Sequence, residues 1–157
     1  MPFARARRLV VSALVACCVV AGAAHAQGQP SKGEQALKYR KAVYQAIAWN
    51  FGPMSAMAQG KAPFDAAEYV TRSGRVAALT PMLAESYSPE TQGVSGSRLK
   101  ASMWTNRADF DAKMKTLVDR SAALAAVAKG GEEAKSKAAF FDVANACKAC
   151  HDEYRAD

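Results

Sequence analysis

Apolar residues recur at three- and four-residue steps over four stretches of the chain, the spacing of one face of an α-helix. The stretches cover residues 33–59, 66–83, 104–129 and 132–154. Two short links and one long link, over residues 85–97, separate them and contain glycine, proline or serine. The pattern predicts an all-α protein, a four-helix bundle with one longer crossover between helices 2 and 3.

Local signals mark the ends of these helices. Asp65, with Glu68 three residues later, has the spacing of a helix N-cap. Gly130 and Gly131 are expected to end the third helix. Pro53 lies inside the first helix and should kink it, because proline removes one backbone donor.

Residues 1–26 have the pattern of a secretory signal. Arg5, Arg7 and Arg8 precede an uncharged apolar run over residues 9–24, and Ala24-His25-Ala26 fits a cleavage site. The run is shorter than the roughly 20 residues of a spanning helix, and we expect no membrane span. The signal predicts export to the periplasm and leaves residues 27–157 as one domain. Leu14-Val15-Ala16-Cys17 also resembles a bacterial lipoprotein box. In that alternative, the mature chain would begin at a lipidated Cys17.

Removal of the signal changes the inventory of reactive side chains. Cys147, Cys150 and His151 are then the remaining cysteines and histidine, so no disulfide framework is expected. The formal charge of +7 includes the three signal arginines, which leaves +4 for the mature chain. That balance suits an acidic redox partner protein. The basic residues are scattered, so nucleic-acid binding is not expected.

The pentapeptide Cys147-Lys148-Ala149-Cys150-His151 lies on the predicted fourth helix. Residues three apart share a helix face, so both thiols can reach one edge of a porphyrin. The motif is typical of covalent haem attachment. It predicts one haem c bound through two thioethers, with His151 as an axial ligand of the iron.

Other interpretations of the motif are weaker. A thiol redox pair usually stands at a helix start in a βαβ unit, and the chain offers no strands. A zinc site would need carboxylates to complete its ligands. The second axial position is open to a methionine, and five methionines follow the signal: Met54, Met57, Met82, Met103 and Met114.

The mature chain resembles the cytochrome c′ family over nearly its whole length. The haem pentapeptide stands at the C-terminal end, and a tryptophan, Trp104, lies near the start of the third helix. The other matching segments are Asp152-Glu153-Tyr154-Arg155, Lys38-Tyr39-Arg40, Asn50-Phe51-Gly52 and residues 59–67. The crossover departs from the relatives' patterns, so the resemblance assigns no haem contact to Met82, Tyr87, Arg98 or Lys100.

The resemblance implies an antiparallel bundle, usually a homodimer, with one five-coordinate haem c. His151 would be the only protein ligand of the iron. Arg40 matches an arginine near the haem propionates, and Lys41 follows it as a haem contact. Tyr44 falls where the family covers the vacant face of the iron, and Arg155 matches a basic residue beside the histidine.

These features predict a periplasmic protein that binds small gases such as nitric oxide and carbon monoxide and that can transfer electrons. The alternative is a low-spin electron-transfer cytochrome with methionine and histidine as axial ligands. An enzyme is not expected, because no distal histidine or other general base is evident.

Overall fold

The computed structural model describes residues 29–157, and the predicted signal segment, its cleavage site and Cys17 lie outside this range. The long helices are α2 (Lys32–Ala58), α3 (Ala66–Ala84), α5 (Arg107–Ala128) and α6 (Glu133–Tyr154). Two short helices, η2 (Pro89–Thr91) and α4 (Ser102–Thr105), lie in the crossover. Within residues 29–157, no helix is both long enough and apolar enough to cross a bilayer.

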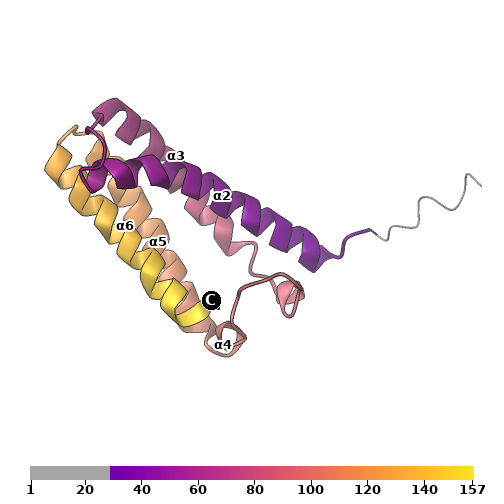
Figure 1. Cartoon of the computed structure of the whole chain (residues 1–157). Coiled ribbons are helices and arrows are strands. Elements are labelled where there is room, and N and C mark those ends of the chain that lie inside the picture. The colour runs from indigo at the N-terminus through magenta and orange to yellow at the C-terminus, as the bar shows by residue number, and fades with distance from the viewer. Residues whose placement is uncertain (1–28) are drawn as a thin grey trace, which may run out of the picture. The chain divides into compact units, whose positions relative to one another are not determined.

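The long helices run side by side in the order α2, α3, α5, α6 (Figure 1). The links between α2 and α3 and between α5 and α6 are short, whereas the chain from α3 to α5 makes the long crossover. Helices joined by short links lie antiparallel. The predicted all-α antiparallel four-helix bundle is therefore confirmed.

The helix ends follow the predicted signals. The Asp65 side chain caps α3 by accepting a hydrogen bond from the Glu68 backbone N–H at 2.9 Å. Gly131, at φ +69°, follows the end of α5, and a left-handed residue there suits glycine. Ser31 and Glu34 form a reciprocal capping box at the start of α2. Pro53 lies inside α2, which continues to Ala58.

The predicted start of the third helix at Trp104 is wrong. Trp104 belongs to the separate helix α4, and α5 begins at Arg107. Asn106 stands between them with φ −110° and ψ 39°, outside helical geometry. Apolar periodicity could not reveal this break, because the buried residues Met103 and Phe110 are seven positions apart and so keep helical spacing across it.

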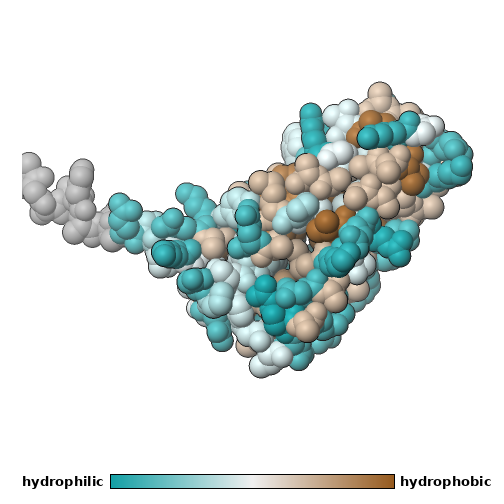
Figure 2. Space-filling model, turned by 180° about the vertical axis from the view of Figure 1, so that it is seen from behind, coloured by the Kyte–Doolittle hydropathy of each residue, from teal (hydrophilic) through white to brown (hydrophobic). Residues whose placement is uncertain are grey.

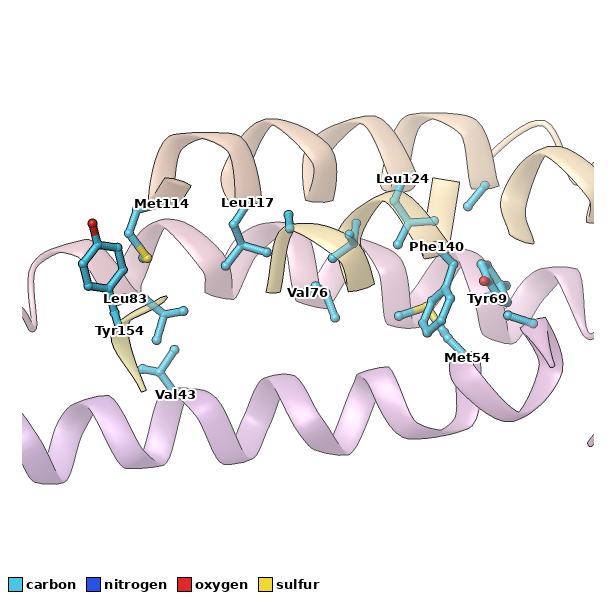
Figure 3. Close-up of a cluster of buried hydrophobic side chains, with 14 of the residues drawn as sticks. Val43, Met54, Tyr69, Val76, Leu83, Met114, Leu117, Leu124, Phe140 and Tyr154 are labelled. Carbon is cyan, nitrogen blue, oxygen red and sulfur yellow. The ribbon is translucent and has the colours of Figure 1, made fainter. Parts of the chain in front are cut away.

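The core runs along the bundle axis and receives side chains from all four long helices (Figure 3). Val76 of α3 and Leu124 of α5 are fully buried, and Val43 of α2 packs into the same cluster. α2 and α6 meet where the rings of Phe51 and Phe140 stack, with centroids 4.3 Å apart. Burial of these side chains is the main stabilising contribution to such a fold.

The first turn of α2 lies very close to the crossover. Gly33 is buried, and a Cβ atom built on it would overlap the Glu90 carbonyl oxygen and lie 2.8 Å from Val94 Cγ2. The obstacle is backbone, which cannot rotate away as a side chain can. Gly33 therefore allows η2 to pack against α2.

We expect Gly33→Ala to lower the free energy of unfolding by about 1–3 kcal/mol, the usual cost of overpacking. Gly52→Ala in the same helix is the matched control, since no atom lies within 4 Å of its added Cβ. That change should be neutral or stabilising by up to about 1 kcal/mol, because alanine favours helices. Chemical denaturation measures both variants. Equal stability of Gly33→Ala and the wild type would contradict the close approach.

Candidate haem site

A cavity of about 280 Å³ lies between the four long helices. α6 contributes Cys147, Cys150 and His151 to its wall, and α2 contributes Tyr44 and Ile47. Most of the other lining residues are apolar: Ala48, Phe51, Val76, Leu83, Met114, Leu117 and Val143. Apolar residues, in brown and tan, are also exposed along the face of the bundle drawn in Figure 2. The structure thus brings the whole predicted attachment motif to one apolar cavity.

Both cysteines are free thiols on the last turns of α6. Burial raises the pKa of Cys147 to about 11, and burial also raises the pKa of Cys150. Thiol redox pairs work through a thiolate with a lowered pKa. These neutral, half-buried thiols therefore do not suit the thiol redox interpretation.

His151 lies between the cavity and an open depression at the end of the bundle. Burial lowers the pKa of His151, and the positive charge of Arg155 lowers it further. The neutral imidazole that this favours is the form that binds a metal. Arg155 lines the same depression as His151, and its contact with the haem stays a prediction.

The crossover holds the chain end that follows His151. Leu99 and Arg155 form an isolated antiparallel bridge, the Lys100 backbone N–H donates to the Tyr154 carbonyl at 2.8 Å, and the Ala156 N–H donates to the Arg98 carbonyl at 2.8 Å. Arg98 and Lys100 also line the depression of about 430 Å³ beside His151. Sequence reasoning assigned them no role, since the crossover has no periodicity that would place them there.

Tyr154 anchors the end of α6 to the start of α5. Its buried hydroxyl donates to an Asp109 carboxylate oxygen at 2.5 Å, and Lys113 Nζ lies 3.1 Å from the other oxygen. The hydrogen bond from Tyr154 is the largest cause that lowers the pKa of Asp109, and the hydrogen bond from Lys113 is the next largest. Lys113 also lines the cavity. The sequence did not indicate this, because Lys113 stands beside the apolar stripe of α5 and not in it.

We expect Tyr154→Phe to lower the melting temperature at neutral pH, with a difference from the wild type that narrows in acid. A carboxyl with a lowered folded pKa stabilises the fold above its unfolded pKa of about 4, and this is lost as the pH falls through the lower folded value. Thermal melts at a series of pH values test this. Tyr69→Phe is the control, because the Tyr69 hydroxyl reaches a backbone carbonyl, that of Ser136, at 3.5 Å. A difference as large in acid as at neutral pH would contradict the assignment.

Tyr44 lines the cavity on α2, and the pentapeptide motif lines the same cavity on α6. Its ring is half-buried and its hydroxyl lies 2.9 Å from the Tyr87 hydroxyl. Burial raises the pKa of Tyr44 well above its ordinary value. The tyrosine is therefore a neutral group at the edge of the space that a haem would fill. Tyr87, in the crossover, was not predicted to take part.

Arg40 is buried, with 5% of its surface exposed. Its guanidinium donates to the Ser86 hydroxyl at 3.3 Å, to the Ser86 carbonyl and to the Thr91 hydroxyl at 3.0 Å. The guanidinium carbon lies 3.9 Å from the centre of the Tyr87 ring. Among the described residues, no carboxylate pairs with it. Burial lowers the pKa of Arg40. A contact with a propionate stays a prediction.

Lys41 lies elsewhere. It is exposed on α2 and lines a groove with Glu34, Lys38 and Val94 rather than the cavity. Its haem contact stays a prediction too.

The methionines differ in whether they border the cavity. Met54, Met57 and Met103 are buried in the core, and Met82 is 40% exposed. Among the described methionines, Met114 of α5 is the one that lines the cavity. In the alternative with methionine and histidine as axial ligands, Met114 would therefore be the methionine that binds the iron.

The residues fit a haem c on three grounds. Two thiols and an imidazole border one cavity, most of the other lining residues are apolar, and the buried guanidinium of Arg40 has no carboxylate partner among the described residues. Within residues 29–157, no group of three or more His, Cys, Asp or Glu side chains has an arrangement that could hold a metal ion by itself.

Comparisons with known proteins agree with this geometry. The family model described as cytochrome C′ matches residues 35–155. The chain is 35% identical over 127 residues to cytochrome c′ of Alcaligenes xylosoxydans xylosoxydans, which covers 81% of this chain and 98% of the relative. It is 36% identical over 130 residues to cytochrome c′ of Rubrivivax gelatinosus, covering 81% and 98% of the two chains.

Solved structures are similar as well. Cytochrome c prime from Shewanella frigidimarina superposes with a TM-score of 0.77 at 40% identity and covers 82% of this chain and all of its own. A nitric oxide complex of a variant of cytochrome c prime from Alcaligenes xylosoxidans gives a TM-score of 0.74 at 33% identity, over 82% of this chain and 100% of that one. The helical bundle, the C-terminal pentapeptide on its cavity and these matches lead to one conclusion: the chain belongs to the cytochrome c′ family.

Proposed function

We propose that this chain carries one haem c on Cys147 and Cys150, with His151 as the sole protein ligand of an iron whose other face binds small gases. Membership of the cytochrome c′ family implies a c-type haem. The observation that carries the proposal is the composition of the cavity wall. Cys147, Cys150 and His151 border it on α6, and Tyr44 and Ile47, which carry neither a thioether nor an imidazole, border it on α2.

The spacing of the thiols supports attachment. Each thiol would add its sulfur and proton across one vinyl double bond, which leaves two thioethers on the same face of α6. Arg40, buried without a carboxylate partner among the described residues, supports an ion pair with a propionate. Lys41 and Arg155 are proposed as further contacts at the rim.

The gas ligands follow from the polarity of the wall and from a relative. When bound, the haem supplies an iron that takes up diatomic gases, and an apolar distal wall gives little hydrogen bonding to them. The relative solved with nitric oxide is 33% identical to this chain. We therefore propose nitric oxide and carbon monoxide as ligands.

We propose binding, with electron transfer as a further role, rather than catalytic turnover. The cavity lining includes no carboxylate, and His151 is its one histidine, so the lining offers neither of these residue types as a general base opposite the iron. The predicted signal segment supports a periplasmic location. The charge of +4 that remains outside the signal supports an acidic redox partner protein. The family resemblance supports a homodimer, and Trp49, 75% exposed on α2, offers apolar surface for one.

The second candidate is an electron-transfer cytochrome in which Met114 fills the sixth position. The location of Met114 on the cavity wall favours it over the other methionines. Two filled axial positions would leave no site for a gas.

Absorption spectra of the reduced holoprotein, recorded during titration with carbon monoxide and with nitric oxide, test the proposed function. We expect a saturable change to a carbonyl and to a nitrosyl spectrum, with one ligand bound per haem. Absence of any change with both gases would contradict the proposal.

A further inference from the structure

Two tyrosine hydroxyls meet at the border of the cavity. Tyr44 comes from α2 and Tyr87 from the crossover, 43 residues away, and their oxygens lie 2.9 Å apart. Within the described chain, each hydroxyl is the other's hydrogen-bond partner. Tyr44 lines the cavity, whereas Tyr87 lies behind it with 6% of its surface exposed.

Tyr87 is fixed on three sides. The Arg40 guanidinium lies over its ring, at 3.9 Å from the centroid, and the Phe110 ring meets it edge-on, with centroids 4.7 Å apart. Arg107 donates to its backbone carbonyl at 2.8 Å. Arg40 is itself held by Ser86 and Thr91. Tyr87 is thus a rigid anchor, and half-buried Tyr44 is the member of the pair with room to move.

Arg40 also places a positive charge against the ring of Tyr87. A cation over an aromatic face stabilises negative charge on the ring, which makes the phenol a better donor. Burial raises the pKa of Tyr87, and the hydrogen bond with Tyr44 and then the charge of Arg40 oppose this effect. The two hydroxyls thus share one hydrogen bond of 2.9 Å, in which either oxygen can be the donor.

We propose that Tyr87 is a positioning residue for the gas site: its hydroxyl holds the Tyr44 ring across the cavity wall and so limits access to the open face of the iron. This inference rests on the proposed function. Loss of the Tyr87 hydroxyl would leave the Tyr44 hydroxyl without its partner, and an unpaired buried hydroxyl is unfavourable. The Tyr44 ring would then turn toward water and leave the ligand site less crowded.

The test compares association rates of carbon monoxide with the reduced holoprotein in Tyr87→Phe, Tyr44→Phe and the double variant. Tyr87→Phe keeps the ring under Arg40 and removes only the hydroxyl. We expect it to raise the association rate about two- to tenfold, the equivalent of one ordinary hydrogen bond. In the Tyr44→Phe background the same change should have no effect. Tyr69→Phe, which removes a hydroxyl far along α3 from this pair, should keep the wild-type rate.

Chemical denaturation of the wild type, Tyr87→Phe, Tyr44→Phe and the double variant supplies a readout that needs no gas. Each single variant should increase the equilibrium constant of unfolding. The increase in the double variant should be about two- to tenfold smaller than the product of the two single increases, because both single variants remove the same hydrogen bond.

The outcomes separate the two proposals. Carbon monoxide binding with an unchanged rate in Tyr87→Phe would overturn the role of Tyr87 and leave the proposed function intact, whatever the denaturation cycle gave. A faster rate that persists in the Tyr44→Phe background would also overturn it, because Tyr87 would then act by another route. A wild-type protein that binds no gas would overturn both.

Discussion

Replacement of both Cys147 and Cys150 with alanine is expected to abolish the retention of haem by the denatured protein. The two thiols are the sulfur atoms on the α6 wall of the cavity, and each would supply one thioether. Without them, a haem held by His151 and apolar contacts alone would dissociate when the bundle unfolds. The intact mass of the denatured protein, together with its absorbance in the haem region, measures the loss.

The single variants are the controls. Cys147→Ala and Cys150→Ala each keep one thiol on the cavity, so each should retain haem through one bond. If the double variant kept haem after denaturation, or if the wild type lost it, covalent attachment at these two positions would be wrong.

The second large effect is expected from Tyr44→Ala. Removal of the ring from the α2 wall should raise the association rate of carbon monoxide about ten- to one hundredfold, because relief of crowding in a packed site is worth about 1–3 kcal/mol. Rapid mixing of the reduced protein with the gas measures this rate.

Tyr39→Ala is the matched control for this change. Tyr39 lies on the same helix, but its hydroxyl donates to Glu85 and its ring does not line the cavity. The control should keep the wild-type rate. A similar increase in both variants would indicate general loosening of α2 instead of a distal role for Tyr44.

Much of the bundle could be predicted from the sequence because helices carry local signals. The apolar period gave the four long helices, and the cap at Asp65 and the glycines after α5 gave their ends. The spacing of Cys147, Cys150 and His151 depends on one helix alone, so their common face was predictable too. The placement of Tyr44 on the facing wall came from the family resemblance.

The features that the sequence did not predict depend on contacts between segments far apart in the chain. The hydrogen bond between Tyr44 and Tyr87 and the bridge between Leu99 and Arg155 join the crossover to helices far away in the chain. The crossover has no period from which such contacts could be read. The partners of Arg40 illustrate the same point. The resemblance placed this arginine near the haem propionates, and the structure gives it two crossover residues, Ser86 and Thr91, as well as the Tyr87 ring.

The central claim is that His151 is the only protein ligand of the iron. Electron paramagnetic resonance and near-infrared spectra of the oxidised protein, recorded for the wild type and for Met114→Leu without any added ligand, test it most directly. Leucine replaces methionine at little cost in a core. We expect a high-spin iron in both proteins and no methionine–iron charge-transfer band. A low-spin wild type with such a band, lost in Met114→Leu, would contradict it.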